Sequence, residues 1–510
     1  MADRSTQPGR QADVIVIGSG VGGASVAHQL AGGAAKVLVL ERGPVLPREP
    51  ENWDVEAVFA QQRYTTTDTW YADGRPFRPG MFYFVGGHTK FYGTAMFRFR
   101  ERDFEALEHA EGVSPAWPIR YADLEPWYGQ AERLFGVRGL AGADPTEPPR
   151  SAAYAHPPIP HEPVLAAIEA RLRAQGLHPF PMPSAVDHGD GGRCRRCPNC
   201  DALPCKIDAK GDAEVRLLRP AVERGGVELR PGVLVERLLT DATGRRIVAV
   251  EVVENGVRSR LVADVFVLSA GAINSAALLL RSACDQHPRG LANSSDVVGR
   301  HYMTHNTTAL MAVHPWRRNR TNFPKTLAVH DHYFGEHGQG HPLGSLQLLG
   351  KIREPMLRGA LPNVPRWLRT ALAEHSVDWY AQSEDLPHPD SRVTLRPDGA
   401  IDLHWHRTNM SAHHRWVARC RQILRDTGWP IVLSSGFGTE VVSHQCGTVR
   451  FGDDPATSAL DANCKAWDHD NLYVVDTGFF PSSAAVNPAL TLAAQALRVG
   501  HHLRHDVLRS

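Results

Sequence analysis

The sequence lacks any long apolar segment. No apolar run in the 510 residues reaches the roughly 18–20 residues that a transmembrane helix needs. The N-terminal stretch MADRSTQPGRQ is polar and has no apolar core of the kind found in secretory signal peptides. We therefore expect a cytoplasmic protein without a membrane span. One other route remains open, since a partner subunit with its own export signal would carry the chain out.

The sequence also lacks a surplus of charge and is poor in cysteine. It has 56 Lys and Arg against 55 Asp and Glu, a formal net charge of +1, and eight Cys. A balanced charge gives no electrostatic reason to expect nucleic acid or an anionic membrane as a partner. In the cytoplasm the cysteines are expected to be reduced. The composition, 42% hydrophobic and 22% charged, is typical of a globular protein with two or three domains.

Residues 12–43 have the pattern strand, tight turn, helix, strand. The apolar run VIVI at 14–17 is typical of a strand covered on both faces, and Gly18, Gly20 and Gly23 then form G-x-G-x-x-G. The first glycine permits the sharp turn, and the second lets the backbone approach a pyrophosphate. The third lets the helix pack closely on the strand. This combination predicts a dinucleotide site.

The second strand of this unit ends in an acid followed by a base. Glu41 stands where a carboxylate accepts hydrogen bonds from a ribose 2′-OH. Arg42 comes next, so a 2′-phosphate remains open from this stretch alone. The fragment ERG at 41–43 resembles the FAD branch of such proteins.

Eight segments in order along the chain resemble the glucose–methanol–choline (GMC) oxidoreductases. They are the N-terminal dinucleotide unit, VGGHTKFYGTAMFRFRERDF at 85–104, WPIRYADLEPWYGQAERLFGVRG at 117–139, VLSAGAINSAALLLRSA at 267–283, VGRHYMTHN at 298–306, SEDLPHPDSRVTL at 383–395, SHQCGT at 443–448 and NLYVVDTGFFPSSAAVNPALTLAAQALRVG at 471–500. The ordered set is far more specific than any one of its members.

The resemblance implies an α/β fold (α+β overall), with a Rossmann-like FAD-binding domain and a substrate domain built on an antiparallel sheet. We expect the FAD-binding domain to be discontinuous. The expected boundaries are 1–140 for its first part, 141–210 for an excursion with a cysteine cluster, 211–300 for its second part, 301–435 for the substrate domain and 436–510 for a C-terminal flavin and catalytic segment.

The resemblance also implies that residues 85–93 lie along the flavin, with contacts from Gly87, Thr89, Tyr92 and Gly93. Some relatives attach the flavin covalently through a histidine in this loop. In this sequence the matching position is Phe91, so we predict non-covalent FAD; a link through the neighbouring His88, which is out of register, is the less favoured alternative.

Further FAD contacts are expected from residues distant in sequence. Val235, in a predicted strand, would reach the adenine through its backbone, and Gly271 would lie beside the nucleotide. Asp476 and Gly478 would reach the pyrophosphate side. Asn487 and Pro488 precede a predicted helix whose N-terminal dipole would favour the anionic reduced flavin.

Four of the eight cysteines lie within twelve residues. Cys194, Cys197, Cys200 and Cys205 are spaced C-x2-C-x2-C-x4-C and have basic neighbours, which favour ionised sulfurs. Such thiolates hold zinc or an iron–sulfur cluster in many proteins. The alternatives are local disulfides or free thiols. We do not favour a metal here, so no metal ligands are predicted.

The chemistry is expected from His444 and Asn487. Oxidising an alcohol requires a base for the hydroxyl proton, and an imidazole with a pKa near neutrality suits that role. A second polar group that holds the hydroxyl oxygen fixes the carbinol hydrogen toward the flavin. The family uses a His–His or His–Asn pair at these two positions. Trp379, Gln382 and Trp405 are the predicted substrate contacts.

The sequence thus predicts an FAD-dependent alcohol dehydrogenase or oxidase. A primary or secondary alcohol of a polar, sugar-like molecule, a saccharide or an aminoglycoside, is the preferred substrate. Sterol-type or choline-type alcohols, a flavin-containing lyase without redox turnover, and a dehydrogenase with an iron–sulfur relay remain alternatives. The electron acceptor, O2, a quinone or a protein, stays open.

Overall fold

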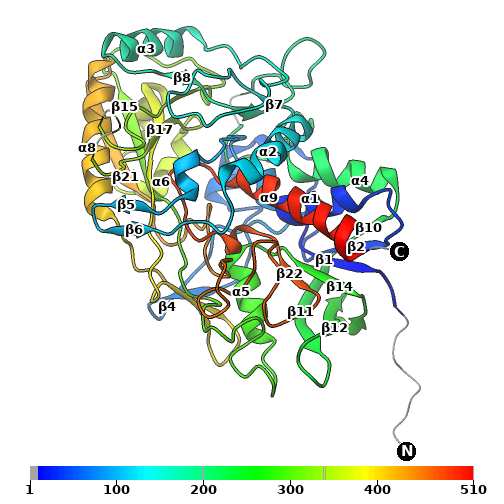
Figure 1. Ribbon diagram of the computed structural model, residues 1–510. Coiled ribbons are helices and arrows are strands. Elements are labelled where there is room, and N and C mark those ends of the chain that lie inside the picture. Colours follow the sequence, from blue (N-terminus) through cyan, green and yellow to red (C-terminus); the bar gives the residue numbers. More distant parts are fainter. Residues whose placement is uncertain (1–9, 198–199, 337, 339, 509–510) are drawn as a thin grey trace, which may run out of the picture.

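The computed structural model describes residues 10–197, 200–336, 338 and 340–508. A five-stranded, wholly parallel sheet forms one half of the molecule (Figure 1). Its strands, in spatial order, are β10 (Val227–Pro231), β2 (Val37–Glu41), β1 (Val14–Ile17), β14 (Val265–Leu268) and β22 (Leu472–Val474).

Helices from both ends of the chain pack together beside this sheet. α1 (Val21–Leu30) contacts α9 (Ala489–His502), and α9 also contacts α2 (Tyr121–Phe135), as the neighbouring blue, red and cyan helices of Figure 1 show. All four residues of β1 are buried, as a parallel strand requires when both its faces are covered. The C-terminal segment is therefore part of the same half as the parallel sheet.

In sequence, a three-stranded antiparallel meander lies between β10 and β14 of the parallel sheet. It consists of β11 (Val233–Thr240), β12 (Ile247–Glu254) and β13 (Val257–Leu261). Asn255 and Gly256 join β12 to β13, and both have positive φ, +50° and +78°. That is the backbone that a two-residue hairpin turn needs and that Asn-Gly adopts readily. α5 (Ala272–Arg281) packs against β11.

The second half is built on a six-stranded antiparallel sheet. Its strands, in spatial order, are β21 (Ile431–Gly436), β15 (Asn306–Val313), β18 (Ser376–Ser383), β17 (Ser345–Leu348), β16 (Leu327–Val329) and β8 (Phe180–Pro181). α8 (Met410–Asp426) contacts β15, β18 and β21, and α3 (Pro163–Ala174) contacts α8 (Figure 1). The predicted fold class is confirmed.

Four residues of α8 explain why it covers this sheet. Trp416, Cys420, Ile423 and Leu424 are buried at a spacing that places them on one helical stripe, and they join Trp379 of β18 in a single apolar cluster. β8 comes from the 141–210 stretch, so part of the predicted excursion belongs to this sheet. The exact domain boundaries stay a prediction.

Several smaller strands and α-helices accompany the two main sheets. They are the sheet of β19 (Arg392–Leu395), β20 (Ile401–His404), β3 (Trp70–Ala72) and β4 (Arg75–Phe77), the pairs β5 (Leu107–His109) with β6 (Gly112–Ser114) and β7 (Val137–Arg138) with β9 (Ser184–Ala185), and the helices α4 (Arg219–Arg224), α6 (Leu357–Ala360) and α7 (Arg366–Glu374). Within the described residues, no helix is both long enough and apolar enough to span a bilayer.

Candidate active site

A cavity of about 690 Å³ lies between the two halves of the molecule. Its walls come from loops that follow β1, β2 and β14, from residues 80–93, and from the substrate sheet and the C-terminal segment. Most of the lining residues fall in 17–22, 40–42, 80–84, 87–89, 91–93, 233–235, 269–271, 380, 382, 437–438, 440–445, 476–477 and 487–489, and others include Asp201, His305, Lys325 and Trp405. The carboxyl ends of parallel strands are the usual place for a bound nucleotide, and the volume is typical of ligand sites.

The glycine turn after β1 has little room for side chains, except toward the cavity. Gly18 has φ +102°, and a Cβ there would lie 2.2 Å from the carbonyl oxygen of Ser269. A Cβ at Gly23 would lie 2.0 Å from the carbonyl oxygen of Gly18, so helix and turn touch at that point. A Cβ at Gly20 would meet no protein atom within 4 Å, and Gly20 lines the cavity. The turn is thus closed on the protein side and open where a pyrophosphate would lie.

Glu41 lines the cavity at the end of β2 and is buried. Its Oε2 accepts hydrogen bonds from the backbone N–H and the hydroxyl of Ser19, at 3.1 and 2.6 Å, and Oε1 accepts one from the N–H of Gly43. The carboxylate therefore also holds the glycine turn in place. Arg42 lines the cavity, lies over the ring of Tyr83 and pairs with Asp68 at 3.2 Å.

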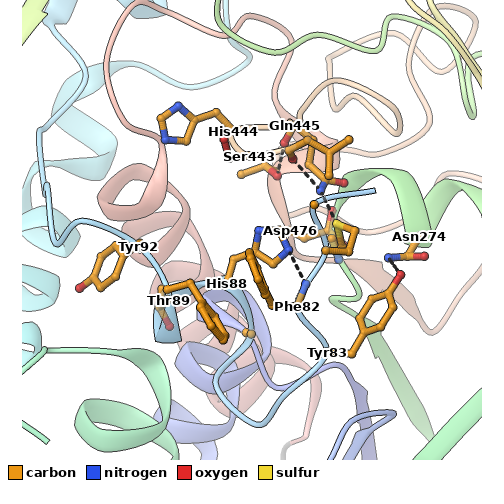
Figure 2. A pocket seen from close by; sticks show the side chains of 18 of the residues that line it. Phe82, Tyr83, His88, Thr89, Tyr92, Asn274, Ser443, His444, Gln445 and Asp476 are labelled. Carbon is orange, nitrogen blue, oxygen red and sulfur yellow. Dashed lines mark hydrogen bonds between the residues drawn. The ribbon is translucent and has the colours of Figure 1, made fainter. Parts of the chain in front are cut away.

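The loop at 86–93 lines the same cavity through Gly87, Thr89, Tyr92 and Gly93. The hydroxyl of Thr89 donates to the Gly86 carbonyl at 2.6 Å, and that of Tyr92 donates to the Gly211 carbonyl at 2.6 Å. Figure 2 shows His444 on one side of the cavity, with Thr89 and Tyr92 on the other.

The two residues weighed for a covalent flavin link, Phe91 and His88, are both engaged with Phe82. The buried ring of Phe91 stacks on that of Phe82 at 4.0 Å. His88 Nε2 accepts a long hydrogen bond, 3.5 Å, from the N–H of Phe82, and burial lowers the pKa of His88 to about 4. Non-covalent FAD remains our prediction for this site.

Val235, Gly271 and Asp476 also line the cavity, whereas Gly478 lies behind its wall. Asp476 is buried and fixes two turns: its Oδ2 accepts from the N–H of Gly271 at 3.1 Å, and its Oδ1 accepts from the N–H of Gly478 at 2.8 Å. Burial raises the pKa of Asp476 to about 6. Gly478 is thus tied to a residue that lines the cavity.

The two residues predicted to carry the chemistry meet in the cavity. Asn487 Nδ2 lies 3.3 Å from His444 Nε2, and both residues line the cavity wall. The backbone of His444 has φ +64°, which is uncommon for residues other than glycine and is often found at functional sites. Burial, with smaller contributions from the neighbouring His305, Lys325 and His88 side chains, holds the pKa of His444 well below its usual value. A neutral imidazole thus faces the cavity beside a carboxamide.

The sequence did not single out two residues of this cluster. His305 Nδ1 lies 2.8 Å from His444 Nδ1, and Gln347 Nε2 donates to the Asn487 side-chain oxygen at 2.9 Å. His305 stands in the VGRHYMTHN segment, which was noted only as a family match. Gln347 carries no local sequence pattern that marks it.

Two of the three predicted substrate contacts, Gln382 and Trp405, line the cavity. The prediction for Trp379 is wrong: its side chain is fully buried in the apolar cluster beneath α8, and it is absent from the cavity wall. Successive side chains of a strand point to opposite faces. On β18, therefore, Tyr380 and Gln382 face the cavity, and Trp379 faces the core.

Cys194 and Cys200 are not among the residues that line the cavity. Cys194 and Cys200 pack against buried Ile159, Val186 and Phe323, and burial raises the pKa of Cys200 to about 12. Burial therefore outweighs the basic neighbours that the sequence suggested would ionise these thiols. Across the described part of the chain, no group of three or more His, Cys, Asp or Glu side chains is placed to hold a metal ion.

Two family models match most of the chain. The N-terminal GMC oxidoreductase model matches residues 10–307, and the C-terminal one matches residues 387–496. The chain belongs to the GMC oxidoreductase family. Membership makes it an FAD-dependent oxidoreductase, and the resemblance noted in the sequence is confirmed.

Curated relatives of this GMC oxidoreductase align over nearly its whole length. A 6'''-hydroxyparomomycin C oxidase of Streptomyces lividus is 33% identical, and a paromamine 6'-oxidase of Streptomyces fradiae is 32% identical, each over 97% of this chain and 92% of the relative. The fructose dehydrogenase large subunit of Gluconobacter japonicus is 27% identical over 97% of this chain and 98% of its own.

A solved structure shows the same fold. Pyridoxine 4-oxidase from Mesorbium loti superimposes with a TM-score of 0.68 at 18% identity, over 97% of this chain and 99% of that one.

The cavity fits FAD. The glycine turn leaves open space at Gly20, α1 begins at the same turn, and α9 begins beside Asn487. Helix N-termini carry unpaired N–H groups that suit phosphate oxygens and anionic rings. The residues present therefore suit the cofactor that the family binds.

Proposed function

We propose that this GMC oxidoreductase oxidises a primary or secondary alcohol of a polar, sugar-like substrate to the carbonyl, with His444 as the base. The observation that carries the proposal is the 3.3 Å approach of Asn487 to His444 inside the cavity. The two residues stand 43 positions apart, and a base beside a carboxamide is the pair that alcohol oxidation calls for.

FAD, when bound, supplies the acceptor for the hydride that leaves the carbinol carbon. The chain supplies the proton chemistry. His444 Nε2 takes the hydroxyl proton as a neutral base, which its lowered pKa allows at neutral pH. The Asn487 amide donates to the same hydroxyl oxygen, because Gln347 holds the amide oxygen on the opposite side at 2.9 Å.

The substrate class is supported by polar and aromatic groups on the cavity wall. Gln382, Tyr380 and Trp405 line the cavity together with Lys325 and Asp201, which form a 2.8 Å ion pair. Such a wall offers both hydrogen bonds and ring faces, which suits a polyhydroxylated molecule better than a sterol. The names of the aminoglycoside and fructose-oxidising relatives point the same way.

Anaerobic mixing of the flavin-loaded protein with a panel of amino sugars, hexoses, sterols and short alcohols tests the proposal. We expect a sugar-like alcohol to bleach the flavin and the others to do so slowly or not at all. Cleavage of a substrate that leaves the flavin oxidised would instead indicate a lyase. Bleaching by sterols alone would contradict the proposed substrate class. The acceptor that reoxidises the flavin is then found by adding O2, a quinone or a protein acceptor.

A further inference from the structure

The atoms around His444 determine which of its nitrogens carries a proton. His305 is buried between His444 and the backbone that precedes Asn487: its Nε2 lies 3.1 Å from the Ser483 carbonyl oxygen, and its Nδ1 lies 2.8 Å from His444 Nδ1. A carbonyl oxygen only accepts hydrogen bonds, so His305 Nε2 must carry a proton. A neutral imidazole has one N–H, which leaves His305 Nδ1 as an acceptor.

Because His305 Nδ1 is an acceptor, it determines which nitrogen of His444 carries the proton. His444 Nδ1 must donate to it across 2.8 Å, so the lone pair of neutral His444 lies on Nε2. Nε2 is the nitrogen that faces Asn487 in the cavity.

We propose that His305 is a positioning residue which, by accepting from His444 Nδ1, fixes His444 in the tautomer whose lone pair points at the substrate hydroxyl. The proposal rests on the proposed function for the step that it serves. His305 borders the cavity, but its two ring nitrogens are taken up by His444 and the Ser483 carbonyl, so it acts through His444.

The orientation of Asn487 agrees with the same assignment. Gln347 Nε2 donates to the Asn487 oxygen at 2.9 Å, and this turns the Asn487 Nδ2 donor toward His444 Nε2. A donor beside Nε2 requires a lone pair there. Two neighbours on opposite sides of the His444 ring thus favour the same tautomer.

One contact opposes this assignment. Gln382 Nε2 approaches His444 Nδ1 at 3.4 Å, and a hydrogen bond there would require a lone pair on Nδ1. His305 would then have to donate through both nitrogens and carry a positive charge. Burial lowers the pKa of His305 to about 4, which opposes that charge at neutral pH. The other charged or titratable groups that influence the two rings are Glu384, Lys325 and His88.

Two amide substitutions separate positioning from simple space filling. Asparagine places an oxygen close to where histidine has Nδ1, so His305→Asn keeps an acceptor for His444. Glutamine reaches the position of Nε2, so His305→Gln keeps the contact with the Ser483 carbonyl but offers His444 no acceptor. Glutamine is also the larger of the two, so a role in packing alone would favour it.

The direct measurement is ¹⁵N NMR of histidine-labelled, flavin-loaded protein without substrate, with the His444 signal assigned by its loss in His444→Gln. We expect the Nδ1–H form in the wild type and in His305→Asn, and a shift toward Nε2–H in His305→Gln. A wild type in the Nε2–H form would overturn the proposal, whichever alcohol the enzyme oxidises.

Flavin reduction by the alcohol found in the panel gives the second readout. His305→Gln should slow reduction by about 10²-fold with little change in KM, and His305→Asn should recover most of the rate. Equal losses in both variants, or a better rate with glutamine, would overturn the proposal. If no alcohol reduces the flavin but His444 is in the Nδ1–H form, the proposed function fails and the tautomer assignment stands.

Discussion

Gln347 offers a sharp test of how the catalytic amide is held. Its side chain is fully buried on β17, and its Nε2 donates to Gln382 Oε1 at 2.6 Å and to Asn487 Oδ1 at 2.9 Å. Gln347→Met keeps the approximate shape and removes both bonds. Each acceptor left unpaired costs about 1–3 kcal/mol, and the cost at Asn487 falls at the low end because that side chain faces the cavity and water can reach it.

We therefore expect Gln347→Met to lower the free energy of unfolding by about 2 kcal/mol and, because the Asn487 amide is no longer fixed, to slow flavin reduction by about 10-fold. Urea unfolding and anaerobic stopped-flow reduction measure the two effects. The matched control is Gln495→Met, since Gln495 is equally buried and its Nε2 donates to the Ala462 carbonyl at 3.0 Å, away from the cavity wall. The control should lose stability and keep its rate. A wild-type rate in Gln347→Met, or equal slowing in both variants, would refute the reasoning.

Three further predictions concern the cofactor, pH and metal content. Gly18→Ala should abolish or strongly weaken FAD retention, because its Cβ would lie 2.2 Å from a backbone oxygen at a φ of +102°; flavin absorbance after gel filtration measures this, and full retention would contradict it. Stability should fall as pH drops from about 6.5 to about 4, because burial lowers the pKa of His413 to about 4 and the unfolded chain takes up the proton first. His413→Gln should reduce the loss of unfolding free energy across that window by up to about 3 kcal/mol, as measured by urea unfolding at several pH values, and an unchanged slope would show that His413 does not contribute. Elemental analysis should find less than one iron or zinc per chain. A stoichiometric metal would instead indicate a zinc or iron–sulfur site at the four clustered cysteines.

The nucleotide-binding half was predictable because its constraints are local. Gly23 is required by a contact with Gly18 inside one strand–turn–helix unit, and the burial of β1 is visible in its sequence as a continuous apolar run. His444 and Asn487 were found through segments that resemble a family rather than through spacing. The structure adds the 3.3 Å distance between them, which no property of either segment alone reveals.

The one failed contact, Trp379, and the two missed residues, His305 and Gln347, depend on how the elements are assembled around the cavity. β18 is buried on both faces, so its sequence does not say whether Trp379 or Tyr380 turns inward. His305 and Gln347 act through partners 139 and 140 residues away, at His444 and Asn487, and such pairings follow only from the assembled sheets.

At the cysteine cluster, the expected effect of the basic neighbours on the thiols is wrong for a different reason. Its basic neighbours suggested ionised thiols, yet burial decides the outcome at Cys200 and raises its pKa to about 12. Burial is a property of the whole fold, so the charge of adjacent residues in sequence was a poor guide to the state of the sulfur.

The most direct test of the account is the rate of anaerobic flavin reduction by a sugar-like alcohol in His444→Gln. As a control, His413→Gln removes another buried histidine, one that lies 2.9 Å from the Thr308 hydroxyl and away from the cavity wall. The account predicts a yellow protein in both variants, with reduction slowed by about 10²-fold or more in His444→Gln and little changed in the control. An unchanged rate in His444→Gln, or a wild-type protein that takes up no FAD, would contradict it.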